Sequence, residues 1–184
     1  MITFPDFPSP DQPPFTAEAS PMLVPAIALV GPSNSGKTEL ICRLLTWLGS
    51  RGLKVAAVKH SHRRLPVDQP GKDTWRFHRA GARVVALAAP GILQVTQTPD
   101  RDPELATVLA ALGPDLDLIL VEGYKHGLLP KLVMVPAGAS LGESQNYHRI
   151  IGYISEQPLP AEQPVFSPSQ VAEIGAFILG QTQT

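Results

Sequence analysis

Residues 31–38 read Gly-Pro-Ser-Asn-Ser-Gly-Lys-Thr and fit the phosphate-binding pattern G-x-x-x-x-G-K-[ST]. Gly31 and Gly36 allow positive φ angles and a close approach of the backbone to oxygen atoms. The N–H groups of the loop and the helix N-terminus behind it are expected to point at phosphate. We expect Lys37 to reach the β- and γ-phosphates and the Thr38 hydroxyl to bind Mg²⁺. The predicted nucleotide contacts of this loop are Gly31, Ser33, Asn34, Ser35, Gly36, Lys37 and Thr38.

A second group of candidate residues is acidic. Glu122 ends the apolar run 117–121, and a carboxylate at the end of a buried strand suits Mg²⁺, which takes few protein carboxylates and keeps waters and phosphate oxygens. Asp68 lies in a loop near the basic stretch, where it could hold Mg²⁺, orient a water or cap a helix. We therefore predict Lys37 and Glu122 as catalytic residues, and Thr38, Glu122 and Asp68 as metal ligands.

A basic, histidine-containing segment follows another predicted strand, at 55–58. We favour phosphate or substrate contacts for Lys59, His60 and His62, because a zinc site wants three or four ligands and two histidines are a weak signal. The single cysteine, Cys42, is a poor third ligand because it falls inside the helix after the phosphate loop, where we expect it to pack.

These residues need a scaffold of alternating strands and helices. The loop at 31–38 lies between an apolar strand at 26–30 and an amphipathic helix that runs to about Gly49. The apolar face of that helix is formed by Leu40, Ile41, Leu44, Leu45 and Leu48. The carboxyl ends of parallel strands carry the chemistry in such folds, so Lys59 and Glu122 should lie at the edge that carries the loop. The sequence predicts a three-layer α/β/α P-loop NTPase fold with a mainly parallel sheet.

The rest of the chain supplies further elements. We predict a mobile loop at 137–147, where the residues are small and polar. Pro90-Gly91 separates two short strands and indicates a turn or hairpin. The predicted strands are 83–89, 92–96, 117–121, 131–135 and 150–154, and the predicted helices are 73–79, 102–112 and 170–179.

The length and composition of the chain limit the number of domains and the class of protein. A chain of 184 residues with 43% hydrophobic residues is one globular domain, which we place at 23–184 after a Pro-rich disordered tail at 1–22. There is no signal-peptide pattern and no apolar run long enough to span a membrane, so we expect a soluble cytoplasmic protein. Residues 51–83 hold nine basic and two acidic residues. This excess suits a second phosphate-bearing ligand or a solvated surface, while no motif supports nucleic-acid binding.

The ordered set of motifs resembles one known family. It comprises the phosphate loop at 31–38, V-K-H-S-H at 58–62, D-Q-P-G-K-D-T-W-R-F-H-R-A-G-A at 68–82 and D-L-I-L-V-E-G-Y-K at 117–125. Together these segments resemble the molybdopterin-guanine dinucleotide biosynthesis protein B family, MobB, over about residues 24–156. The segment at 1–22 is not part of the pattern.

The resemblance implies a dimeric protein that binds GTP with Mg²⁺, hydrolyses it slowly, and assists the partner nucleotidyltransferase MobA, which attaches GMP to molybdopterin. It implies nucleotide contacts for Lys59, His60 and Lys125 besides the loop, and a metal role for Glu122. Guanine specificity rests on the resemblance alone, because the N-K-x-D motif of ordinary GTPases is missing.

Two other functions remain open at this point. The first is a small-molecule kinase that uses residues 59–79 as its acceptor site. The second is a non-catalytic interaction module that retains the loop for stability. Slow hydrolysis with partner-dependent effects would indicate the adaptor. Turnover that depends on an acceptor molecule would indicate the kinase. A lack of nucleotide binding would indicate the interaction module.

Overall fold

The structure is a computed structural model that describes residues 24–63 and 65–182; the predicted tail at 1–22 and Arg64 lie outside them. A six-stranded sheet forms the centre, with the strand order β2-β5-β1-β6-β7-β8 and every pairing parallel. In chain order the elements are β1 Ala26–Val30, α1 Lys37–Gly49, β2 Val55–Lys59, α2 Asp73–Arg79, β3 Val84–Ala89, β4 Ile92–Gln97, α3 Leu105–Ala110, β5 Leu118–Glu122, β6 Lys131–Met134, the 3-10 helix Gly142–Asn146, β7 Ile150–Ile154, β8 Val165–Phe166 and α4 Val171–Gln181.

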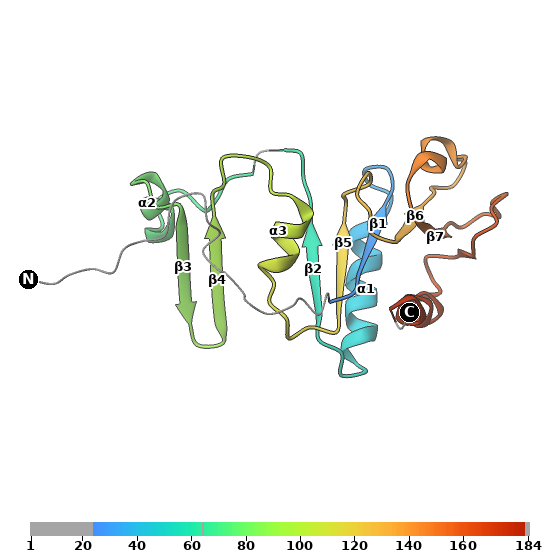
Figure 1. Ribbon diagram of the computed structural model, residues 1–184, viewed down its shortest axis with the longest axis horizontal. Helices are drawn as coiled ribbons and strands as arrows, with labels where there is room; N and C mark the ends of the chain where they lie inside the picture. The colour runs from blue at the N-terminus through green and yellow to red at the C-terminus, as the bar shows by residue number, and fades with distance from the viewer. Residues whose placement is uncertain (1–23, 64, 183–184) are drawn as a thin grey trace, which may run out of the picture.

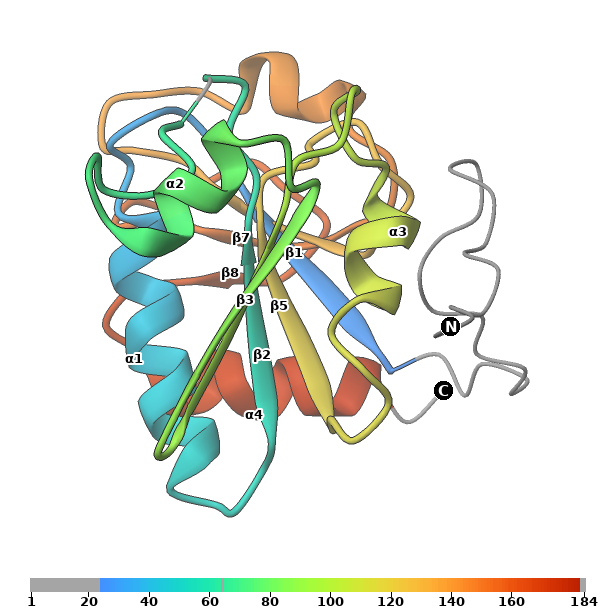
Figure 2. The ribbon, with the colours of Figure 1, turned by 90° about the vertical axis from the view of Figure 1, so that its left-hand side faces the viewer.

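Helices cover both faces of this sheet, and α1 and α3 lie on opposite sides of it in Figure 2. On one face, α1 and α4 pack over Ile27 and Leu29 of β1 and over the facing residues of β5. On the other, partly buried residues of α3 pack near Ala28 and Val30. Since side chains alternate across a strand, β1 is buried throughout and anchors both cores. The three-layer α/β/α arrangement is as predicted.

Helix α1 has the predicted apolar face. Leu40, Ile41, Leu44 and Leu48 are buried, and Leu45 packs against the same core. Cys42 is different: it is exposed, so the expectation that it packs is wrong. Its position one residue beyond Ile41 places it on the polar side of the helix.

An antiparallel hairpin of β3 and β4 stands apart from the central sheet, with Ala89 paired to Ile92 across the turn. Figure 1 shows it beyond the β2 edge, with α2 at one end. The Pro90-Gly91 turn was predicted, but whether the two strands would join the main sheet was not. No helix within residues 24–63 and 65–182 is long and apolar enough to cross a membrane.

Most elements match their expected bounds within one or two residues, and three segments differ more. Helix α3 begins at Leu105 and not at Asp102, because a residue that precedes a proline disfavours the helical conformation and Pro103 follows Asp102. The segment 137–147 contains a 3-10 helix, and its Leu141 is buried in the core on the α3 side of the sheet. Strand β8 has two residues, too few to give a periodic pattern.

Candidate functional site

The phosphate loop connects β1 to α1 through a series of left-handed backbone conformations. The φ angles are 149° at Gly31, 60° at Asn34 and 86° at Gly36. At Gly31 a Cβ atom would lie 2.7 Å from the carbonyl oxygen of Met134, so a larger residue would push the loop away from β6. Helix α1 then begins at Lys37, which places the loop at a helix N-terminus suited to anions.

Lys37 lies across this loop. Its Nζ donates hydrogen bonds to the carbonyl oxygen of Pro32 at 2.5 Å and to Ser35 Oγ at 3.3 Å. Burial lowers the pKa of Lys37; the Glu122 carboxylate opposes that shift, and the Lys59 ammonium adds to it. A partly desolvated ammonium beside a second cation favours a ligand that brings negative charge.

Three side chains from three elements meet beside the loop. Thr38 Oγ1 donates to Glu122 Oε2 at 2.7 Å, and Lys59 Nζ lies 3.3 Å from Thr38 Oγ1 and 3.2 Å from Glu122 Oε1. The sheet register explains this meeting, because Lys59 and Glu122 are paired terminal residues of the neighbouring strands β2 and β5. A hydroxyl and a carboxylate are the hard oxygen donors that Mg²⁺ takes.

The loop and these strand ends line one cavity of about 1040 Å³. The predicted site residues that line it are Gly31, Ser33, Asn34, Ser35, Gly36, Lys37, Thr38, Lys59, His60, Glu122 and Lys125. We call it the P-loop cavity. Cys42 also lines it, a position that the packing expectation did not foresee.

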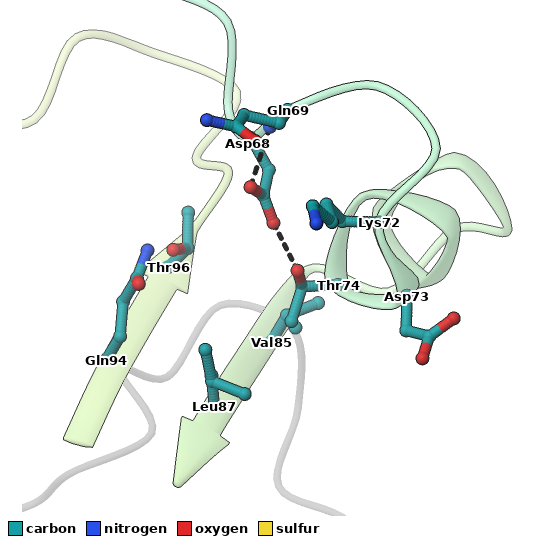
Figure 3. A pocket seen from close by; sticks show the side chains of 9 residues that line it. All are labelled: Asp68, Gln69, Lys72, Asp73, Thr74, Val85, Leu87, Gln94 and Thr96. Carbon is teal, nitrogen blue, oxygen red and sulfur yellow. Dashed lines mark hydrogen bonds between the residues drawn. The ribbon is translucent and has the colours of Figure 1, made fainter. Parts of the chain in front are cut away.

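Asp68 lies elsewhere, in a second cavity of about 400 Å³ between the start of α2 and the hairpin (Figure 3). Its carboxylate accepts hydrogen bonds from the Thr74 hydroxyl and, at 2.7 Å, from the backbone N–H of Gln69. These bonds lower the pKa of Asp68. The structure does not bring Asp68 together with Thr38 and Glu122, and its carboxylate holds the first turn of α2 to the preceding loop.

The basic stretch at 51–83 does not form one patch. Lys54 pairs with Asp115 at 2.6 Å, at the end of β2 opposite the P-loop cavity. Arg83 pairs with Asp100 at 2.8 Å, and the Arg51 guanidinium lies 3.5 Å above the Trp47 ring. Among the lysines and arginines of this stretch that the structure describes, only Lys59 and Arg63 line the P-loop cavity.

Sequence reasoning missed Asp102, which we expected to begin a helix. His60 Nε2 lies 3.2 Å from Asp102 Oδ2, and the His60 ring stacks on Tyr124 with 4.1 Å between the ring centroids. The Tyr124 hydroxyl donates to the Pro103 carbonyl at 3.1 Å. The Asp102-Pro103 dipeptide was the available signal, because it favours a turn over a helix.

The chain is similar to known proteins over most of its length. The family model described as "Molybdopterin guanine dinucleotide synthesis protein B", MobB, matches residues 26–156. The molybdopterin-guanine dinucleotide biosynthesis adapter protein of Escherichia coli K12 is 31% identical over 167 residues, which span 88% of this chain and 95% of that protein. The probable adapter protein of Bacillus subtilis 168 is 32% identical over 163 residues, or 85% and 92% of the two chains.

Solved structures agree with these sequence matches. A crystal structure of a MobB homologue from Bacillus stearothermophilus aligns with a TM-score of 0.69 and 29% identity, covering 86% of this chain and 97% of that one. A crystal structure of molybdopterin-guanine biosynthesis protein B aligns with a TM-score of 0.72 and 27% identity, covering 86% and 99%. The family match spans well over half of the chain and includes the phosphate loop, β5 and the predicted motifs between them. The chain therefore belongs to the MobB family.

Proposed function

We propose that this protein is a GTP-binding adapter that acts in forming the guanine dinucleotide of molybdopterin. The contact between Thr38 Oγ1 and Glu122 Oε2, next to the phosphate loop, carries the nucleotide part of the proposal. Mg²⁺ would bind these two oxygen donors, and Lys37 and Lys59 would meet the phosphate charge. The names of the relatives support the adapter role. The preference for GTP rests on the family resemblance, and the guanine dinucleotide in those names is consistent with it.

Slow hydrolysis fits the composition of the cavity. Fast P-loop hydrolases use a glutamine to orient the attacking water, or an arginine finger to stabilise the transition state. No glutamine occurs among the described residues that line the P-loop cavity, and Arg63 is the one arginine there. We therefore assign the nucleotide a mainly structural role, in which a partner protein recognises the GTP-bound form of this protein.

A titration tests the nucleotide site. The parent should bind GTP more tightly than ATP, and binding should require Mg²⁺. Lys37→Ala should weaken GTP binding by about a hundredfold or more, because it removes the ammonium that meets the phosphates. Glu122→Gln keeps the shape of the side chain but removes its charge, so it should flatten the Mg²⁺ dependence. Lys72→Ala, an exposed lysine at the other cavity, is the matched control.

Equal GTP affinity in the parent and Lys37→Ala would contradict the nucleotide site. A preference for ATP, together with turnover that depends on a small-molecule acceptor, would favour the kinase. If Glu122→Gln keeps the parent's Mg²⁺ requirement, Glu122 is not a metal ligand. Asp68 would then be the next candidate for that role.

The partner surface is proposed at the rim of the same cavity. Arg63 and Lys125 are exposed there and suit molybdopterin phosphate or an acidic surface of the MobA transferase. Arg63→Ala with Lys125→Ala should reduce stimulation of guanine dinucleotide formation in a reconstituted assay more than it reduces GTP affinity. Added salt should weaken the parent's effect, since exposed charges are screened within about 8 Å at physiological ionic strength.

A further inference from the structure

Two histidines and a carboxylate converge at the edge of the P-loop cavity. His60 and His62 follow β2, and Asp102 lies in the irregular segment before α3, so distant parts of the sequence supply the three groups. One ligand atom from each of the three lies within 4.8 Å of the other two. We propose that His60, His62 and Asp102 bind one divalent transition-metal ion of the zinc type, separate from the Mg²⁺ site.

The spacing of the donor atoms suits a tetrahedral ion. Bonds of 2.0–2.1 Å at tetrahedral angles place two ligand atoms roughly 3.3 Å apart. His60 Nε2 and Asp102 Oδ2 are already 3.2 Å apart. The His62 ring meets the His60 ring edge to face, with 4.5 Å between centroids, so a rotation of the exposed His62 side chain completes the set.

The surroundings hold His60 in place. Its side chain is only 11% exposed, and its ring stacks on Tyr124. The backbone N–H of His60 donates to the carbonyl oxygen of Glu122 at 2.9 Å. A Cβ at Gly123 would lie 3.0 Å from His60 Cβ, so the close approach of His60 favours a glycine directly after β5.

Tyr124 also holds the segment that carries Asp102. The Tyr124 hydroxyl donates to the Pro103 carbonyl, directly after Asp102. Tyr124 therefore contacts the His60 ring with its own ring and the Asp102 segment with its hydroxyl. Such outer contacts, which fix the orientation of the ligands, are typical of built metal sites.

The donor types separate this site from the one at Thr38 and Glu122. Imidazole suits Zn²⁺ and other transition metals, whereas Mg²⁺ prefers oxygen donors. Three protein ligands leave a fourth position for water or for an atom of a molecule in the P-loop cavity, which His60 and His62 both line. The ion would be a second fixed positive charge beside the nucleotide.

The test uses the full chain without nucleotide and with excess Mg²⁺, which occupies the oxygen site. Calorimetric titration with Zn²⁺ should show one ion per chain, and Co²⁺ should give the intense visible absorption of a tetrahedral complex. Asp102→Asn and His62→Asn should each weaken Zn²⁺ binding by at least about tenfold and reduce the Co²⁺ absorption. The matched controls His148→Asn and Asp115→Asn change exposed residues away from the site, Asp115 at the opposite end of β2, and should bind as the parent does.

Three results would overturn the proposal. These are an absence of stoichiometric Zn²⁺ binding, unchanged affinity in both ligand variants, and an equal loss in a control. In each case His60 and Asp102 would form only a hydrogen-bonded pair. The titration contains no nucleotide, so its failure leaves the GTP proposal to be judged on its own measurements.

Discussion

Lys131 is a lysine whose whole side chain is buried in a strand of the central sheet. Its Nζ donates to the carbonyl oxygens of Gly127 at 2.5 Å, Leu129 at 2.8 Å and His148 at 3.0 Å. These three bonds use all the donors of an ammonium and hold together the loops before β6 and β7. Because the loop before β6 continues from Glu122, the same lysine also stabilises the chain next to the P-loop cavity.

Lys131→Met should therefore destabilise the protein by about 3 kcal/mol, because three carbonyl oxygens lose their partner. Urea denaturation measures this difference. Lys72→Met, which removes an exposed lysine, should change the free energy of unfolding by less than about 0.5 kcal/mol. Similar values for the two variants would show that the buried bonds add nothing net.

The same residue predicts a pH dependence with a definite sign. Burial lowers the pKa of Lys131 below its usual 10.5, so in alkaline solution the folded state releases this proton before the unfolded state does. The free energy of unfolding then rises with pH between the folded-state pKa and 10.5. The difference between the parent and Lys131→Met should grow over that window, and a difference that shrinks would contradict the assignment.

On one face of the sheet, α1 and α4 leave no room for a side chain at one position of α4. A Cβ at Gly175 of α4 would lie 2.5 Å from Cε3 and Cζ3 of Trp47 in α1. The Trp47 ring packs against the core and carries the Arg51 guanidinium 3.5 Å above it, so shifting the ring would disturb both contacts. The glycine in the middle of α4 is therefore required by packing, despite its poor helix propensity.

Helix α4 offers a matched pair of glycines for a test. Gly175→Ala should destabilise the protein by about 1–3 kcal/mol, because overpacking outweighs the propensity gain of about 1 kcal/mol. Gly180→Ala should be neutral or stabilise by up to about 1 kcal/mol, since no heavy atom lies within 4 Å of its added Cβ. Urea midpoints measured in parallel would reveal the contrast, and a stabilising Gly175→Ala would show that the helices can separate freely.

At the level of elements, the sequence predicted what local patterns encode. The face of α1, the buried run of β5 and the loop between β1 and α1 each have a period or motif within a dozen residues. The structure has both elements and the loop where they were expected, while phosphate binding by the loop stays a prediction. Asp102, Lys131 and Gly175 have roles set by residues far away in the chain. No local pattern predicts that Asp102 contacts His60 or that Lys131 donates to three carbonyl oxygens. These contacts can be recognised only from the three-dimensional structure.

For the whole molecule, the hairpin of β3 and β4 stands outside the central sheet and exposes several apolar side chains. Its exposed apolar side chains are Val84, Leu87, Ile92, Leu93 and Val95. Apolar patches of this kind mark interaction sites. We propose that a second copy of the chain covers the hairpin, in agreement with the dimer that the family resemblance implies.

Leu93→Glu should then weaken self-association by at least about tenfold, because it places a charge in an apolar contact. Light scattering over a range of concentrations measures the molecular mass. Leu128→Glu is the control, since Leu128 is 74% exposed and Leu93 73% exposed, but Leu128 lies in the loop before β6. A monomeric parent, or equal effects of both variants, would exclude the hairpin as the interface.

The strand order also determines at which stage of synthesis the P-loop cavity can form. β1 lies between β5 and β6, with Ala26 paired to Ile119 and Ala28 to Lys131. On the ribosome the phosphate loop is therefore made long before either neighbour of its strand. Contacts of such high sequence separation slow folding, because loop closure costs entropy before the pairing is gained. Until β5 and β6 emerge, the apolar β1 has no strand partner in the nascent chain, and exposed apolar segments of this kind favour aggregation.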